Sequence, residues 1–119
     1  MKRILYIEDN EDTADAVKVI LTNAGFDAEI SLCGKDGIES ASKGFDLILI
    51  DIMLPDMSGW DVFTKLYEKI KSKFAFLSAI PVSKERMAEL KKSGVSDYIT
   101  KPFTKDDLVS RVKKMLAEK

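Results

Sequence analysis

The feature that most constrains the fold of this chain is a series of short apolar runs separated by polar residues. The clearest runs are residues 4–7, 47–50 and 74–77, each four residues long. Apolar runs of this length, rich in β-branched or aromatic side chains, are typical of strands buried on both faces of a parallel sheet. Residues 28–32 and 98–100 show a weaker form of the same pattern. The sequence therefore predicts five strands.

Apolar residues at helical spacing follow each predicted strand. The helical segments are a stripe from Ala14 to Ala24, residues 34–43, 60–70 and 83–92, and a stripe from Leu108 to Leu116. Gly25 stands where a helix end favours a residue that tolerates positive φ, and Ser83 and Thr104 are suited to N-cap positions. This alternation predicts a parallel sheet that is covered by helices on both faces.

Composition limits the classes of protein to which the chain can belong. Its 119 residues, 45% hydrophobic and 33% charged, fit one globular domain over residues 1–119. A net charge of -1 gives no overall basic field for nucleic acid. The lone Cys33 and the absence of histidine exclude an internal disulfide, a Cys/His metal site and a histidine catalyst. Because neither a signal peptide nor an apolar run of about 20 residues is present, we expect a cytoplasmic domain without membrane contact.

Polar side chains end four of the five predicted strands. Glu8 and Asp9 follow the first strand, Asp51 the third, Ser78 the fourth and Lys101 the fifth. Ligands of open parallel sheets bind at the carboxyl ends of the strands, near a topological switch point. We therefore expect these side chains to converge at one edge of the sheet.

The types of side chain in this group suit phosphoryl transfer. Neighbouring carboxylates raise each other's pKa unless a cation neutralises them, and Mg²⁺ prefers oxygen ligands. Asp51 would be the nucleophile that attacks phosphorus, while the cation and Lys101 stabilise charge on the phosphoryl oxygens and Ser78 donates a hydroxyl. Singly, an aspartate at a strand end usually caps a helix and a lysine is usually solvated. The combination is what favours the chemical interpretation.

The motifs resemble those of the receiver domains of two-component response regulators, over nearly the whole chain from Arg3 to about Leu116. The matching segments are the acidic pair in residues 7–10, the phosphorylation loop in residues 51–59, the Ser-Ala pair at 78–79, and residues 98–103 with their aromatic switch position, lysine and proline. The resemblance implies a three-layer, flavodoxin-like (α/β)5 fold with strand order 2-1-3-4-5.

The resemblance also implies a role for each site residue. Asp51 would accept the phosphoryl group, assisted by Lys101 and Ser78. The ligands of Mg²⁺, for which Mn²⁺ could substitute, would be Asp51, Asp9, Glu8 through water, and the carbonyl of Met53. Ser78 and Tyr98 would be the switch residues. The bond between Lys101 and Pro102 is expected to be cis.

The implied partners are a sensor histidine kinase or phosphotransfer protein and a downstream output domain or protein. The face made by the fourth helix, fifth strand and fifth helix would report the phosphorylated state, without direct nucleic-acid binding. Asp97 and Arg111 resemble positions that pair across a phosphorylation-dependent homodimer, whereas Met87 stands where a basic residue would complete that set. Beyond accepting and losing its own phosphoryl group, the domain is not expected to be an enzyme.

Several residues depart from the family pattern or bear on its alternatives. Glu8 stands where aspartate is commoner, the stretch from Asp51 to Ser78 is short, and a proline follows Ile80. Because Met53 and Ile80 are apolar and cannot orient a water, we expect slow self-dephosphorylation. One alternative is a pseudo-receiver that binds partners without phosphorylation. Another is a small phosphohydrolase, although no Asp-x-Asp pattern or Gly-rich phosphate loop is present.

Overall fold

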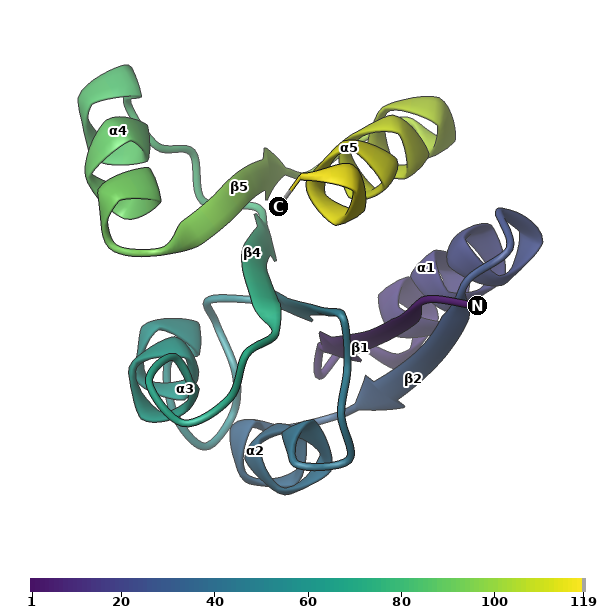
Figure 1. Ribbon diagram of the computed structural model, residues 1–119, viewed down its shortest axis with the longest axis horizontal. Helices are drawn as coiled ribbons and strands as arrows, with labels where there is room; N and C mark the ends of the chain where they lie inside the picture. The colour runs from purple at the N-terminus through teal and green to yellow at the C-terminus, as the bar shows by residue number, and fades with distance from the viewer. Residues whose placement is uncertain (119) are drawn as a thin grey trace.

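Each apolar run of the sequence forms a strand of one parallel sheet (Figure 1). A computed structural model describes residues 1–118, in which five strands alternate with five helices. The elements are β1 (Arg3–Ile7), α1 (Glu11–Asn23), β2 (Asp27–Ser31), α2 (Gly34–Ala41), β3 (Leu47–Ile50), α3 (Gly59–Leu66), β4 (Lys73–Ser78), α4 (Lys84–Lys92), β5 (Val95–Thr100) and α5 (Lys105–Ala117). The strand order β2-β1-β3-β4-β5 confirms the predicted flavodoxin-like fold.

The sheet separates two apolar clusters, one under each layer of helices. Helices α1 and α5 cover one face, and α2, α3 and α4 cover the other (Figure 1). Successive strand residues point to opposite faces. Leu5 and Ile48 therefore lie in the cluster under α2, α3 and α4, while Ile4 and Leu47 lie in the cluster under α1 and α5. Both faces are buried, which is why the central strands are apolar at every position.

Two predicted boundaries are wrong by three or four residues. Helix α3 ends at Leu66 and not at residue 70. Beyond the C-cap residue Tyr67, whose N–H donates to the carbonyl of Phe63, Lys69 and Ile70 both donate to the carbonyl of Leu66 as the chain turns toward β4. Strand β5 begins at Val95 and not at residue 98. Its first residue is buried and pairs with Phe74 ahead of a shift in register, but the polar residues that follow Val95 interrupt the apolar pattern.

Local signals in the sequence set most of the other boundaries. Ser83 and Thr104 accept hydrogen bonds from backbone N–H groups at the starts of α4 and α5, which confirms both predicted N-caps. Gly25 has φ of 96° just beyond α1, a conformation that favours glycine. At Gly59 the requirement is space, because an added Cβ would lie 2.3 Å from the carbonyl oxygen of Asp51. The start of α3 can therefore approach the end of β3 closely.

Candidate functional site

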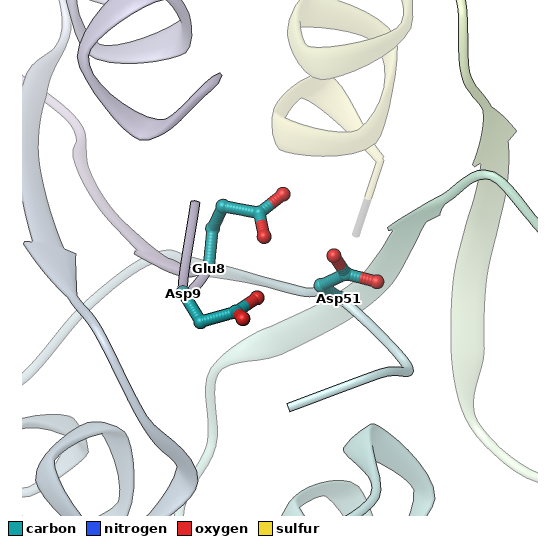
Figure 2. A group of neighbouring side chains, drawn as sticks. All are labelled: Glu8, Asp9 and Asp51. Carbon is teal, nitrogen blue, oxygen red and sulfur yellow. The ribbon is translucent and has the colours of Figure 1, made fainter. Parts of the chain in front are cut away.

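The carboxyl ends of β1 and β3 bring three carboxylates together. Glu8, Asp9 and Asp51 each offer an oxygen that lies within 4.8 Å of the other two, and Figure 2 shows the three side chains around one small space. The backbone N–H of Asp51 donates to the carbonyl of Ile7 at 3.0 Å, which continues the β1–β3 pairing into the site. Glu8 and Asp51 are buried, at 1% and 8% exposure, whereas Asp9 is exposed. The group therefore has a buried floor and an open side.

Lys101 supplies the positive charge of this group. Its Nζ donates to Oε1 of Glu8 and lies 3.3 Å from Oδ2 of Asp51. Its backbone N–H donates to the carbonyl of Ser78 at 2.8 Å, which fixes the chain at the end of β5 beside the end of β4. The following bond to Pro102 is cis, as predicted. One lysine thus lies between two buried carboxylates.

Tyr6 also belongs to this site, although the sequence predicted only that it lies in a strand. The residue is fully buried, and its hydroxyl donates to Oε1 of Glu8 at 2.9 Å. The N–H of Asn10 donates to the other oxygen, Oε2, at 3.3 Å. Tyr6 precedes Glu8 by two positions, so both side chains leave the chain on the same side. A tyrosine hydroxyl within an otherwise apolar strand was the available signal.

The two buried carboxyl groups have opposite pKa shifts. Burial raises the pKa of Asp51, and its hydrogen bond with Glu8 and the charge of Glu8 raise it further, which Lys101 only partly offsets. Burial also raises the pKa of Glu8, but hydrogen bonding to Lys101 and then to Asp51 outweighs it, so the pKa is lowered overall. Lys101 therefore mainly stabilises the ionised form of Glu8. Ionised Asp51 would be stabilised by a further positive charge.

The oxygen donors at this sheet edge fit a hard divalent cation. Three carboxylates with one open side match the preference of Mg²⁺ for carboxylate oxygens and waters. Both oxygens of Glu8 already accept hydrogen bonds, from Tyr6 and Lys101 on one and from Asn10 on the other. Glu8 is therefore better placed to hold a ligand water than to bind a cation directly.

Ser78 is the last residue of β4, and Tyr98 lies two residues before the end of β5. Ser78 is buried, and its hydroxyl accepts a hydrogen bond from the N–H of Ile80 at 3.3 Å. The hydroxyl of Tyr98 donates to the carbonyl of Ile80, and the ring is only 2% exposed. Burial raises the pKa of Tyr98. Tyr98, one of the two predicted switch residues, thus lies buried, with its hydroxyl turned toward the loop after β4.

Two apolar side chains stand at the mouth of the site. Met53 is 68% exposed and Ile80 is 40% exposed. The N–H of Met53 donates to Oδ1 of Asp51 at 3.2 Å, which keeps the start of this loop close to the acceptor carboxylate. Neither side chain has a hydroxyl, an amide or a charge that could hold a water.

Asp97 and Arg111 contact each other within the same chain. Nη1 of Arg111 lies 3.4 Å from Oδ1 of Asp97 and donates to the carbonyl of Tyr98 at 3.2 Å. Nε of Arg111 lies 3.4 Å from a carboxylate oxygen of Asp107. A pairing of these residues across a dimer would require them to exchange these partners.

Comparison with known proteins shows which family has this fold. The model of the response regulator receiver domain matches residues 4–113. The transcriptional regulatory protein PcoR of Escherichia coli is 36% identical over 118 residues, which cover 98% of this chain and 52% of that protein. The chain spans about half the length of the curated relatives it matches.

Solved structures show the same architecture. A CheY-like receiver domain protein from Methanospirillum hungatei JF-1 has a TM-score of 0.88 at 30% identity, covering 98% of this chain and 94% of that one. The response regulator TrrA of Thermotoga maritima, solved in complex with Mg²⁺ and BeF, has a TM-score of 0.83 at 28% identity, covering 97% and 99%. With the family match over residues 4–113, this chain belongs to the receiver domains of two-component response regulators.

Proposed function

We propose that this domain is a phosphorylation-dependent signalling switch whose acceptor is Asp51. The observation that carries the proposal is the position of Asp51, a buried carboxylate beside Lys101 within a group of acids that lies open on one side. A carboxylate oxygen would attack the phosphorus of a phosphohistidine on a sensor histidine kinase or phosphotransfer protein. The phosphorus–nitrogen bond would break, the imidazole would leave, and Asp51 would become an aspartyl phosphate.

Mg²⁺ is the cation that we propose for the acidic group, and Mn²⁺ could substitute for it. Asp9, Asp51 and the carbonyl of Met53 would hold it directly, with Glu8 acting through a water. The relative TrrA, whose structure contains Mg²⁺ and BeF, supports this choice. When bound, the cation would neutralise charge on the carboxylates and on the phosphoryl oxygens. Lys101 would remain hydrogen-bonded to Glu8 and could reach a phosphoryl oxygen with its other donors.

The response to phosphorylation would begin at Ser78 and Tyr98. The Ser78 hydroxyl would leave the N–H of Ile80 and donate to a phosphoryl oxygen. Because Tyr98 donates to the carbonyl of Ile80, a shift of this loop would be transmitted to β5 and to the face formed by α4, β5 and α5. That face would control an output domain or protein, and a phosphorylation-dependent homodimer could form there if Arg111 exchanged its partners.

We infer a cytoplasmic domain that is not an enzyme beyond its own phosphorylation and dephosphorylation. Within residues 1–118, no helix combines the length and apolarity needed to traverse a lipid bilayer. The proposal includes neither direct nucleic-acid binding nor membrane contact. A pseudo-receiver is not favoured, because Asp51, Ser78 and Lys101 are all present and adjacent.

Incubation with acetyl phosphate and Mg²⁺, followed by intact-mass measurement, tests the assignment. We expect the wild-type domain to gain one acid-labile phosphoryl group and Asp51→Asn to gain none while it keeps its circular dichroism spectrum. Asp56→Asn is the matched control, because Asp56 lies in the same loop but outside the acidic group. Full labelling of the Asp51→Asn variant would refute the assignment.

A further inference from the structure

A hollow lies between α2 and α3, away from the acidic site. Its volume is about 380 Å³, and its apolar floor is formed by Ile38, Met57 and Leu66. The first two side chains are half-buried and pack against the core cluster on this face of the sheet, while the third is buried. Figure 1 shows the two helices side by side on the same face. We name this hollow the α2–α3 groove.

Three lysines surround the α2–α3 groove. Lys35, Lys65 and Lys69 line it and are exposed, whereas Glu39 is the single acid among its lining residues. Within residues 1–118, none of these lysines forms an ion pair with a carboxylate. The groove thus combines an apolar floor with a rim in which these three lysines outnumber one acid.

The acceptor loop holds one wall of the groove in place. Asp56 accepts hydrogen bonds from the N–H groups of Gly34 and Lys35 at 2.8 and 2.9 Å. Cys33, at the N-cap position of α2, forms no side-chain cap of its own. Met57 packs so closely on Gly34 that an added Cβ would lie 2.5 Å from its Cγ. The groove is therefore already formed, which reduces the entropy cost of binding.

We propose that the α2–α3 groove binds an acidic amphipathic helix of a partner protein. An apolar side chain of that helix would fill the hollow above Ile38 and Met57, and carboxylates on either side would lie over the lysines. Helices commonly bind in this way, with anchors one turn apart in an apolar groove between helices. A lipid surface fits less well, because the apolar residues form the floor of a concavity and do not project from the surface.

This inference goes beyond the proposed switch, since none of the lining residues belongs to the acidic group. The probe is a displayed library of acidic amphipathic helices in which two apolar positions one turn apart are varied. Wild-type protein should enrich binders. A purified binder should lose about tenfold or more in affinity for Lys65→Glu/Lys69→Glu, equivalent to about 1.4 kcal/mol. Binding should also weaken as salt screens the lysines.

Further variants distinguish binding in the groove from a general effect of net charge. Lys18→Glu/Lys92→Glu makes the same change in net charge away from the groove and should bind as wild type does. Ile38→Gln places a polar group in the apolar floor of the groove, so it should weaken binding while the circular dichroism spectrum is unchanged. Changes in amide shifts in NMR spectra should be confined to the residues that line the groove and their neighbours. Asp51→Asn should bind normally, so failure of the switch would not disturb this result.

Three outcomes would overturn the proposal. One is a library that enriches no helix on wild type, or enriches the same helices equally on the Lys65/Lys69 variant. Another is a set of amide shifts that lie away from the residues that line the groove. The third is binding to vesicles rich in phosphatidylserine that depends on Lys65 and Lys69 while no helix binds.

Discussion

Replacing Tyr6 with phenylalanine would remove one oxygen atom from the buried side of the site and leave the aromatic ring in place. That oxygen donates to Oε1 of Glu8 at 2.9 Å, and both residues are almost completely buried. A hydrogen bond to a charged acceptor contributes about 1.5–3 kcal/mol. Glu8 keeps Lys101 on the same oxygen and the N–H of Asn10 on the other. We therefore expect the free energy of unfolding to fall by about 1.5 kcal/mol, the lower end of that range.

The assay is urea unfolding followed by circular dichroism, across a range of pH. The midpoint should fall without a change in the slope, because the variant exposes the same surface on unfolding. Tyr6 is one of the groups that lower the pKa of Glu8 below its ordinary value of 4.5. A carboxyl group with a lowered pKa stabilises the fold above its unfolded pKa and loses that contribution as pH falls through its folded pKa. The difference between the variant and wild type should therefore be full at neutral pH and shrink below about pH 4.5.

Tyr67→Phe is the matched control, because Tyr67 is 44% exposed and should lose no stability. Equal midpoints for Tyr6→Phe and wild type at neutral pH would refute the reasoning. So would a difference that stays constant on acidification, since it could not then act through the Glu8 carboxylate.

Two further predictions concern the cation and the lifetime of the phosphoryl group. Asp9→Ala should lose Mg²⁺-induced thermal stabilisation, because a proposed ligand is removed. The cation-free variant should be slightly more stable than wild type, by at most about 1 kcal/mol, because an exposed charge near Glu8 and Asp51 is gone; unchanged Mg²⁺ titration would contradict this. Met53→Asn with Ile80→Glu should shorten the phosphoryl half-life several-fold, because polar side chains could then orient a water, and a factor of ten needs only about 1.4 kcal/mol of barrier. An equal half-life, measured by loss of the phosphorylated mass with Mg²⁺ binding intact, would rule out control by these side chains.

The fold could be predicted from the sequence because its signals are local and repeated. Apolar runs that end in polar residues identify strands buried on both faces, and alternation with helices leaves few topologies. Convergence of Asp51 with Lys101 follows from that topology alone, since the carboxyl ends of parallel strands share one edge of the sheet. The start of β5 could not be predicted, because pairing with β4, and not the pattern of residues 95–97, determines it.

Contacts between separate elements could not be predicted from the sequence alone. The cap that Asp56 provides to α2 spans 21 and 22 positions, and no local pattern marks it. The pairing of Arg111 with Asp97 inside one chain depends on how α5 packs on β5. Such contacts follow from packing, which the periodicity of the sequence does not specify.

The ion pairs of Lys101 join parts of the chain that leave the ribosome at different times. Glu8 and Lys101 are 93 positions apart, and Asp51 and Lys101 are 50 apart. At about 5–20 residues per second, Glu8 would wait roughly 5–20 s for its lysine. If Glu8 and Asp51 were buried before Lys101 was made, they would lack their cationic partner, which costs about 3–5 kcal/mol. The acceptor site is therefore among the last parts of the domain to be completed.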